Sequence, residues 1–552
     1  MGLKLVIIGG VAGGATAAAR ARRLNEDAEI ILFERGEFIS FANCGLPYYV
    51  SGIIEKKDQL LVTTKESFEA RYNINIRHLS EVTSINRDEK YVEVNDSGQG
   101  EVYKETYDRI ILTPGAEPIK PPIPGIDDAK VYTVRNIPDS ETIKALIDSG
   151  KVKKAIVAGG GFIGIEMAEN LAHKGVDVTI VEMADQVMAP LDSEIAETVH
   201  YYLKEKGIKL LLSEAITSFE QEGDSNFIIT SKGSRIDFDM VILSVGVKPE
   251  KNLAIESGLE TGITGAIAVN GHMQTSDPDI YAVGDAVEVK DFVTGMPVII
   301  PLAGPANKQG RIAANNVFGG KDIYKGTQGT AIVKVFDMTI ASTGANEKTL
   351  SRQNAEFLVS YTNSYSHATY YPGAASMIIK LLFTPENGKI LGAQITGFGG
   401  VDKRIDVIAT AIRAGMTVFD LEDLELAYAP PYSSAKDPVN IAGFVASNII
   451  KGDSKAFVWE KGFKLKENEV LIDLRDKFEF RFTPMIEGSI NIPLNDLRYK
   501  LDGLDKNKKY YLYCAIGLRG YLGYRVMSQY GFDAVNVSGG VSMINLMEAK
   551  GE

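Results

Sequence analysis

The fold is decided first by the stretch LKLVIIGGVAGG at residues 3–14, which joins an apolar run to a glycine-rich turn. The run predicts a buried strand, and the alanine-rich residues that follow predict a helix. Gly9 and Gly14 suit the tight turn between them, whereas Val11 stands where such turns usually have a second glycine. Glu34 ends the next predicted strand, where a carboxylate can accept a hydrogen bond from a ribose hydroxyl. Together these features predict a dinucleotide-binding unit.

A second copy of this arrangement occurs further along the chain. The predicted strand at residues 154–158 leads into Gly159, Gly161 and Gly164, which have the full spacing Gly-x-Gly-x-x-Gly. The strand after that helix ends in Glu182. A carboxylate there favours a free ribose 2'-hydroxyl over a 2'-phosphate, which predicts NADH in preference to NADPH. Two bound dinucleotides are therefore expected.

A matched pair of segments supports an internal duplication. The segment DRIILTPGAEP begins at Asp108, and the related segment DMVILSVGVKP begins at Asp239. One such motif could be chance, but two motifs at corresponding places indicate repeated units. A further strand, IYAVGD, ends at Asp285, where the carboxylate could hydrogen-bond the ribityl chain of a flavin. The chain is therefore expected to be α/β, with two interleaved Rossmann-like domains.

Composition excludes several other classes of protein. The 552 residues carry a net charge of -13, which argues against a nucleic-acid or anionic-membrane partner because those surfaces need a basic footprint. Hydrophobic residues make up 45% of the chain, which is ordinary for a globular protein. The length suggests about three to four domains, and no apolar run approaches the roughly 18 residues of a membrane span. We expect a cytoplasmic protein, and no metal site is predicted.

Only two cysteines occur in the sequence, and each lies in a motif typical of reactive thiols. Cys44 is found in SFANCGLP and Cys514 in CAIGLRG, at opposite ends of the chain. A disulfide framework would need more partners, so two separate centres of sulfur chemistry are indicated. The sequence thus predicts a protein that transfers or reduces sulfur.

Across residues 1–447 the chain resembles the FAD- and NAD(P)H-dependent pyridine nucleotide disulfide oxidoreductases. The two glycine turns, the paired segments and Asp285 carry this resemblance. It implies a homodimer and three domains: FAD-binding at 1–120 and 245–325, NAD-binding at 150–244, and an α+β dimerisation domain at 326–447.

Cys44 is similar to the thiol of those relatives that use a single cysteine, because the other cysteine lies in a separate predicted domain. Such relatives include NADH oxidases, NADH peroxidases and coenzyme A disulfide reductases, which share a Ser-Phe-x-x-Cys-Gly stretch. Peroxidase-like members carry a histidine in the first glycine turn, where this chain has Ala12. Ser40 and Asn43 match substrate contacts of the family. The resemblance implies that Cys44 cycles between a thiolate and a mixed disulfide, sulfenic acid or persulfide.

Two tyrosine-rich segments, ATYYPG and AYAPPYSSAKD, resemble the coenzyme A disulfide reductase branch. By this resemblance Tyr370 and Lys436 contact coenzyme A, while Tyr428 lies near the flavin. Both segments reach across the dimer interface in the family. The choice between Tyr370 and Tyr371 stays open. A tyrosine hydroxyl could donate the proton that a departing thiolate needs, and packing at an aromatic interface is the alternative role.

One face of the first predicted helix suits a phosphate-rich thiol. Thr16, Arg20 and Arg23 fall at i, i+4 and i+7 and therefore share that face. On an acidic protein, an arginine pair beside a reactive cysteine suits the phosphates of coenzyme A. A solvated charged face is the simpler alternative.

The pattern restarts as a further α/β domain that resembles rhodaneses over residues 461–552. Cys514 ends a predicted strand and opens a loop that runs to Arg519 before a helix. Backbone N–H groups and a helix N-terminus would stabilise a thiolate or persulfide there. The resemblance makes Cys514 the sulfur acceptor, with Arg519 and the pair Asp473 and Arg475 as supports of the loop. An inactive interaction module is the alternative.

The sequence therefore favours an NADH-dependent flavoenzyme that binds FAD, with coenzyme A as a substrate or tightly bound ligand. It would reduce coenzyme A disulfide, coenzyme A persulfide or related sulfane-sulfur species, and the rhodanese-like domain would deliver or accept sulfur. NADPH stays possible as the electron donor. Two rivals stay open: an NADH oxidase in which oxygen takes the electrons, and a sulfur carrier or redox sensor with negligible NADH turnover.

Overall fold

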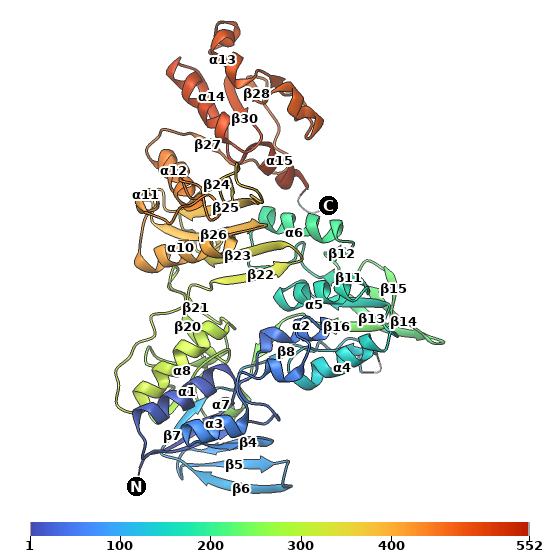
Figure 1. Cartoon of the computed structure of the whole chain (residues 1–552), viewed down its shortest axis with the longest axis vertical. Coiled ribbons are helices and arrows are strands. Elements are labelled where there is room, and N and C mark those ends of the chain that lie inside the picture. The colour runs from blue at the N-terminus through green and yellow to red at the C-terminus, as the bar shows by residue number, and fades with distance from the viewer. Residues whose placement is uncertain (1, 128, 550–552) are drawn as a thin grey trace. The chain divides into compact units, whose positions relative to one another are not determined.

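The computed structural model (Figure 1) describes residues 2–127 and 129–549. The chain divides into two compact units. Unit 1 contains Met1–Met183 and Glu214–Gly329, and unit 2 contains Ala184–Ser213 and Thr330–Glu552. The expected α/β class is confirmed, because parallel sheets flanked by helices occur in both units.

The first sheet of unit 1 is built around the opening strand of the chain. Its strand order is β19–β7–β1–β2–β3, and all neighbouring pairs are parallel. Such central strands are buried on both faces, which explains the continuous apolar run that opens the sequence. The elements are β1 (Lys4–Ile8), β2 (Glu29–Phe33), β3 (Asn75–Arg77), β7 (Arg109–Leu112), β19 (Ile280–Ala282), α1 (Ala12–Leu24), α3 (Lys65–Tyr72) and α8 (Ala303–Val317).

The second sheet of unit 1 repeats this pattern, with neighbouring parallel strands in the order β11–β10–β16–β9. Asp108 accepts a hydrogen bond from the N–H of Lys4 at 2.7 Å, and Asp239 accepts one from the N–H of Lys154 at 2.9 Å. The aspartate that precedes β7 thus bonds the start of β1, and the aspartate that precedes β16 bonds the start of β10 in the same way. The elements are β9 (Val131–Tyr132), β10 (Lys154–Ala158), β11 (Asp177–Glu182), β16 (Met240–Leu243), α4 (Ile137–Asp148) and α5 (Phe162–His173).

Smaller antiparallel elements complete unit 1. They form the sheets β4–β5–β6 and β13–β14–β15, the pair β17–β8, and the mixed sheet β18–β20–β21. Their bounds are β4 (Ser80–Asn86), β5 (Tyr91–Asp96), β6 (Glu101–Thr106), β8 (Ala116–Pro118), β13 (Ile216–Glu222), β14 (Ser225–Thr230), β15 (Arg235–Phe238), β17 (Val247–Pro249), β18 (Ile267–Ala268), β20 (Val287–Lys290) and β21 (Pro297–Val298). Short helices are η1 (Asn43–Gly45), α2 (Leu46–Ser51), η2 (Lys57–Leu60) and α7 (Asn252–Glu256).

An antiparallel sheet of order β22–β23–β26–β25–β24 forms the first part of unit 2. All eight residues of β26 are buried, because helices cover a sheet that would otherwise be exposed. The strands are β22 (Ala331–Val335), β23 (Met338–Gly344), β24 (Leu358–Tyr365), β25 (Ser376–Phe383) and β26 (Ile390–Gly397). The other elements are α6 (Ser193–Glu205), β12 (Lys209–Leu212), α9 (Glu347–Arg352), α10 (Val401–Ala414), α11 (Val418–Asp423) and α12 (Pro438–Ile450).

A parallel sheet of order β27–β31–β30–β28–β29 forms the C-terminal part of unit 2. Its strands are β27 (Ala456–Phe457), β28 (Glu469–Asp473), β29 (Ile490–Asn491), β30 (Lys509–Tyr513) and β31 (Asp533–Val537). Its helices are η3 (Lys477–Arg481), α13 (Leu494–Lys500), η4 (Leu501–Gly503), α14 (Leu518–Gln529) and α15 (Gly540–Ala549). Among the helices of residues 2–127 and 129–549, none is both long enough and apolar enough to cross a membrane.

Candidate active site

The first glycine turn, between β1 and α1, uses conformations that only glycine adopts easily. Gly9 has a φ of +101°, and a Cβ atom added there would lie 2.2 Å from the carbonyl oxygen of Thr113. A Cβ atom on Gly14 would lie 1.8 Å from the carbonyl oxygen of Gly9. The hydroxyl of Thr113 also donates to the carbonyl oxygen of Gly9 at 2.7 Å. The helix therefore starts tightly against the sheet, as in turns that bind phosphate at a helix N-terminus.

The second glycine turn, between β10 and α5, repeats these contacts at corresponding atoms. Gly159 has a φ of +102°, and an added Cβ atom would lie 2.4 Å from the carbonyl oxygen of Ser244. A Cβ atom on Gly164 would lie 2.0 Å from the carbonyl oxygen of Gly159. The hydroxyl of Ser244 donates to that same oxygen at 2.9 Å. The duplication thus extends to individual hydrogen bonds.

Two carboxylates lie beside these turns. Glu34 accepts a hydrogen bond from the N–H of Gly10 at 2.8 Å, and Glu182 accepts one from the N–H of Gly160 at 2.7 Å. A ribose hydroxyl of a bound dinucleotide would meet carboxylates at these places. At Gly161, an added Cβ atom would have open space around it, with no described atom within 4 Å. That space is what the approach of a pyrophosphate requires.

The starts of α1 and α5 also fit phosphate binding. Within the described parts of the chain, the N-cap residues of these helices, Val11 and Gly161, make no side-chain hydrogen bond to the helix. Their first N–H groups would otherwise need solvent or a ligand as hydrogen-bond acceptor. Val11 stands at the position of Gly161, so the first turn carries a side chain where the second has none. Both turns fit the dinucleotides FAD and NAD(H).

Asp285 follows β19 at the carboxyl edge of the first sheet, which is where dinucleotides bind in such folds. The N–H of Gly284 donates to the side chain of Gln309 on α8 at 2.8 Å, which fixes this turn. Burial raises the pKa of Asp285, and the charge of Arg135 opposes that rise. The carboxyl group is thus a sheltered polar group suited to the hydroxyls of a ribityl chain.

Cys44 lies in η1, which leads directly into α2. The N–H of Ser40 donates to the carbonyl oxygen of Gly10 at 2.9 Å, so the cysteine segment is tied to the first glycine turn. Ser40 has a φ of +45°, which is uncommon for a residue other than glycine. The Oδ1 atom of Asn43 is buried and has no hydrogen-bond partner among the described residues. Ser40 and Asn43 therefore flank the thiol, and Asn43 offers a spare acceptor.

The surroundings of Cys44 oppose its ionisation. The residue is exposed on one side, yet neighbouring atoms desolvate the thiol, and this raises its pKa. The charges of Glu166 and Asp285 raise it further. Glu166, on α5, accepts a hydrogen bond from the hydroxyl of Tyr48 at 3.4 Å. Burial raises the pKa of Glu166 to about 7 and that of Tyr48 to about 12.

Tyr48 and Glu166 were not predicted as site residues, because their contact joins segments far apart in the chain. The one available signal was a glutamate within the otherwise apolar stretch FIGIEMA at the start of α5. Such a residue in a buried helix is a candidate for a perturbed, functional acid.

The predicted polar face of α1 is turned mainly toward α8. The hydroxyl of Thr16 donates to Asn307 at 2.6 Å, and Nε of Arg20 donates to Asn315 at 2.6 Å. Arg23 lies in the last turn of the helix and is exposed. Thr16 and Arg20 are therefore held in place by α8.

Tyr370 and Tyr428 are brought together in unit 2. Their hydroxyl oxygens lie 2.8 Å apart, either can donate, and this contact raises the pKa of Tyr370. Both tyrosines and Lys436 line a pocket of about 400 Å³. Tyr371 instead packs its ring edge-on against His367, with centroids 5.6 Å apart. The structure thus places Tyr370, and not Tyr371, in the hydroxyl pair.

A buried arginine, also missed from the sequence, holds both tyrosine segments. Arg404 is 1% exposed, and its Nη2 atom donates to the carbonyl oxygen of Ser366 and to Asp437, at 2.9 Å each. Ser433 donates to the same carboxylate at 2.6 Å. Burial opposes ionisation of Asp437, but the hydrogen bonds from Arg404 and Ser433 lower its pKa. The hydrogen bonds of Arg404 therefore join the two tyrosine segments.

Cys514 follows β30 and is buried, with 1% exposure. Its Sγ atom accepts a hydrogen bond from the N–H of Gly517 at 3.2 Å. Gly517 has a φ of +102° and is the N-cap residue of α14, so the sulfur lies at a helix N-terminus that favours an anion. A Cβ atom on Gly540 would lie 2.4 Å from the carbonyl oxygen of Cys514. This close approach requires glycine.

Arg519 lies in the first turn of α14 and not in the loop before it, because the helix begins earlier than predicted, at Leu518. Its guanidinium donates to both carboxylate oxygens of Glu479, at 2.6 and 2.7 Å. The hydrogen bonds to Glu479 raise the pKa of Arg519, and the sulfur of Cys514 raises it further. Arg475 is buried and pairs with Asp473 at 2.6 Å. Arg519 therefore links the first turn of α14 to η3, whereas Arg475 donates to the carbonyl oxygens of Thr483 and Pro484, outside the Cys514 loop.

Comparison with known families identifies three segments of the chain. The family model of the pyridine nucleotide-disulphide oxidoreductases matches residues 3–310, and the model of their dimerisation domain matches residues 330–438. A rhodanese-like domain matches residues 461–545.

Curated relatives cover about four fifths of the chain. A coenzyme A disulfide reductase of Staphylococcus haemolyticus is 35% identical over 81% of this chain and 100% of its own length. An NADH oxidase of Methanocaldococcus jannaschii is 36% identical over 80% of this chain and 98% of its own length.

Two solved structures are similar over nearly the whole chain. The reduced CoADR-RHD of Bacillus anthracis has a TM-score of 0.97 and 50% identity, and the alignment covers 99% of this chain and 98% of that one. An NAD-dependent persulfide reductase from A. fulgidus has a TM-score of 0.92 and 38% identity, with 98% and 100% covered. Together with the paired glycine turns, these matches show that the chain belongs to the pyridine nucleotide-disulphide oxidoreductases, enzymes that use FAD and NAD(P)H, and that it carries a rhodanese-like domain.

Proposed function

We propose that the protein is an NADH-dependent flavoenzyme that reduces coenzyme A disulfide, coenzyme A persulfide or a related sulfane-sulfur species. The observation that carries this proposal is Cys44, an accessible thiol tied to the first glycine turn in a sequence whose other cysteine lies beyond β30. A lone thiol exchanges with sulfur of a small molecule and not with a second thiol beside it. Relatives named coenzyme A disulfide reductase and persulfide reductase support this reading.

Cys44 would act as the nucleophile. Its thiolate attacks one sulfur of coenzyme A disulfide, forms a mixed disulfide and releases one coenzyme A thiolate. Two electrons from NADH then cleave the mixed disulfide, which releases the second coenzyme A and restores the Cys44 thiolate. With coenzyme A persulfide, the thiolate attacks coenzyme A's own sulfur atom and breaks the S–S bond, so that the outer sulfur leaves as hydrosulfide and the same mixed disulfide forms before the reductive step. FAD, when bound, supplies the path that carries electrons from NADH to sulfur.

The cofactors are assigned to the two glycine turns. FAD would occupy the first turn, with Gly9, Gly14, Glu34 and Asp285 around it, within residues 1–120 and 245–325. The pyridine nucleotide would occupy the second turn, within residues 150–244. Glu182 supports NADH, because a carboxylate at the ribose would repel the 2'-phosphate of NADPH.

Coenzyme A would be recognised by the polar face of α1 and by the tyrosine pocket. Thr16, Arg20 and Arg23 would contact its phosphates, since guanidinium groups bind phosphate by charge and by paired hydrogen bonds. Ser40 and Asn43 would contact the thiol end beside Cys44.

The tyrosine pocket would belong to a homodimer. Tyr370 is 74% exposed and Tyr428 is 48% exposed, and large exposed aromatic side chains gathered in one place are typical of an interface. The match to the dimerisation domain supports the same assembly. The hydroxyl pair would hold the proton that a leaving coenzyme A thiolate requires, and Lys436 would contact coenzyme A.

Cys514 would accept sulfur in the rhodanese-like domain, within residues 461–552. The N–H of Gly517 and the nearby Arg519 would stabilise its thiolate or persulfide, because both supply positive potential at the sulfur. In a reducing compartment such as the cytoplasm, both thiols would stay reduced between turnovers.

Steady-state NADH oxidation by the full-length flavoprotein tests this assignment, with coenzyme A disulfide, coenzyme A persulfide or polysulfide as acceptor. We expect Cys44→Ser to lower turnover of the first two by about 10³-fold or more, because it removes the nucleophile, while bound flavin is retained. Cys514→Ser should spare disulfide reduction and impair the use of polysulfide. Normal persulfide turnover by Cys44→Ser would refute the proposal.

An NADH oxidase is the second candidate, favoured by the 36% identity to a relative of that name. Oxygen would then take the electrons, and Cys44 would cycle through a sulfenate. Oxygen consumption measured beside persulfide-dependent NADH oxidation separates the two, and we expect the persulfide reaction to be faster.

A further inference from the structure

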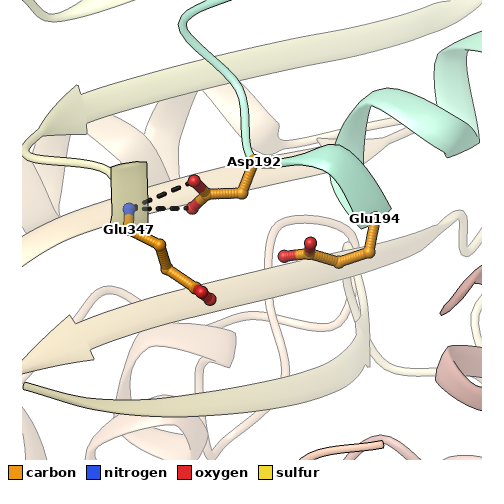
Figure 2. Close-up of side chains that lie close together, drawn as sticks. All are labelled: Asp192, Glu194 and Glu347. Atoms are coloured by element: carbon orange, nitrogen blue, oxygen red, sulfur yellow. Dashed lines mark hydrogen bonds between the residues drawn. The ribbon is translucent and has the colours of Figure 1, made fainter. Parts of the chain in front are cut away.

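A cluster of four charged side chains lies in unit 2, outside the sites described above. Figure 2 shows the carboxylates of Asp192, Glu194 and Glu347 close together. The ammonium group of Lys380 contacts all three, at 2.8 Å from Asp192 and 2.5 Å from Glu347. Lys380 is completely buried. Three carboxylates so close together could hold a metal ion, but here the lysine supplies the positive charge.

The cluster favours the charged forms of Lys380 and Glu194. Burial alone would lower the pKa of Lys380, but the charges of Glu194, Asp192 and Glu347 raise it overall. Burial would likewise raise the pKa of Glu194, but Lys380 lowers it. Buried charges that lose their partners are costly, so these side chains are fixed relative to one another. Lys380 lies on β25 of the antiparallel sheet, so the cluster is a rigid anchor on that strand.

Tyr361, on β24, is attached to this anchor. Its side chain is 3% exposed, and its hydroxyl donates to Glu194 at 3.0 Å. The N–H of the same residue donates to the hydroxyl oxygen of Ser538 at 3.3 Å. A Cβ atom added to Gly539 would lie 3.3 Å from Cβ of Tyr361. The turn that follows β31 therefore packs directly against this tyrosine.

The same turn supports the loop of Cys514. The N–H of Val541 donates to the carbonyl oxygen of Cys514 at 2.8 Å, and the N–H of Ser542 donates to that of Ala515 at 3.2 Å. The loop carbonyls thus satisfy N–H groups in the first turn of α15, which would otherwise lack partners. A shift of the turn would move the Cys514 carbonyl and the loop that stabilises the sulfur.

We propose that Tyr361 is a positioning residue for Cys514, with its side chain fixed by the Lys380 cluster. The inference rests on the proposed function of Cys514 as a sulfur acceptor. Its basis is a continuous series of contacts from the cluster, through Tyr361 and the turn at residues 538–540, to the Cys514 loop. Tyr361 also shares one hydrophobic cluster with Tyr513 of β30. The reactive loop therefore takes part of its geometry from the antiparallel sheet.

The variant Tyr361→Phe in the full-length flavoprotein tests this role, because it removes the hydroxyl and keeps the ring. The readouts are sulfur transfer from thiosulfate to cyanide and the pH dependence of Cys514 alkylation. We expect sulfur transfer to fall about tenfold, since small displacements of reacting groups are costly. The alkylation profile should move to higher pH as the thiolate loses its aligned N–H group. NADH-driven reduction of coenzyme A disulfide should stay unchanged.

Tyr510→Phe is the matched control. Tyr510 is also buried, on the strand that leads to Cys514, and its hydroxyl donates to the carbonyl oxygen of Asp505 at 2.8 Å. Its loss should leave both readouts unchanged. Ser538→Ala should act like Tyr361→Phe, but more weakly.

Wild-type sulfur transfer and a wild-type alkylation profile in both Tyr361→Phe and Ser538→Ala would overturn the inference. The proposed function of Cys514 fails by a different result, namely full sulfur transfer by Cys514→Ser. In that case the alkylation profile of Tyr361→Phe still decides whether Tyr361 positions the thiol.

Discussion

Cys44 and Cys514 lie in surroundings that differ in exposure and in charge. Cys44 is exposed on one side and faces the carboxyl groups of Glu166 and Asp285, which raise its pKa. Cys514 is buried, accepts the N–H of Gly517 and lies near the guanidinium of Arg519. The protein's own groups thus oppose the anion at the first thiol and support it at the second.

The difference shows how one chain could keep the two proposed sulfur reactions apart. A buried thiol at a helix N-terminus is suited to carry a persulfide anion. An accessible thiol without such support is suited to a bulky disulfide or persulfide, and its thiolate must be favoured by the bound cofactor or substrate. Each of the following changes acts on one side of this comparison.

Among variants that keep both cysteines, the largest effect is expected from Gly540→Val. Its first side-chain atom would lie 2.4 Å from the carbonyl oxygen of Cys514, so the loop must move. We expect sulfur transfer from thiosulfate to cyanide to fall by about 100-fold or more, because the reacting group is misplaced. Reduction of coenzyme A disulfide in the same preparation should be unchanged. Equal loss of both activities would show that the two centres are not separate.

Arg519→Gln should have the next largest effect. It removes the two hydrogen bonds to Glu479 and the positive charge near Cys514. Hydrogen bonds to charged groups contribute about 1.5 to 3 kcal/mol, so sulfur transfer should fall by about 10- to 100-fold. Arg525→Gln is the control, because Arg525 lies on the same helix but pairs with Asp453. A similar loss in both variants would count against a role at the sulfur.

Tyr428→Phe should act only on the Cys44 reaction. It removes one member of the hydroxyl pair and leaves Tyr370 in place. We expect kcat for coenzyme A disulfide to fall about tenfold, below the full contribution of a general acid because one hydroxyl is retained. Tyr432→Phe changes another exposed tyrosine of the same segment and is the control. Unchanged kcat in Tyr428→Phe would exclude the pair from proton transfer.

The smallest effect is expected from Glu166→Gln. The pKa of Glu166 is about 7, so its negative charge opposes the Cys44 thiolate mainly above neutral pH. The variant should lower the pKa of Cys44, measured by alkylation rate against pH. Because the folded protein keeps a proton on Glu166 up to about pH 7, this group's contribution to stability falls as pH rises from 4.5 to 7. The variant should lose that slope in thermal unfolding, and an unchanged slope would contradict the assignment.

The parts of the fold that depend on local sequence patterns could be predicted from the sequence. The strand predicted at residues 154–158 coincides with β10, and Cys514 follows a strand as expected. Apolar runs and glycine turns determine structure over a few residues, so the strands and turns that they form can be predicted from the sequence. The start of α14 was placed too late, because Leu518 and Arg519 were counted with the loop.

The long-range polar contacts could not be predicted in the same way. The Tyr48–Glu166 and Arg404–Asp437 contacts each join separate segments, and nothing local marks the partners. The Lys380 cluster is hidden for the same reason. Such pairs depend on tertiary packing, which decides which polar groups are buried together.

The central claim is that coenzyme A reacts at Cys44 and transferable sulfur at Cys514. The most direct test is to treat the reduced full-length protein with coenzyme A disulfide or with thiosulfate and to map the adducts by peptide mass spectrometry. We predict a coenzyme A adduct on Cys44 after the first reagent and a single added sulfur on Cys514 after the second. A coenzyme A adduct on Cys514 with Cys44 unmodified would contradict the account.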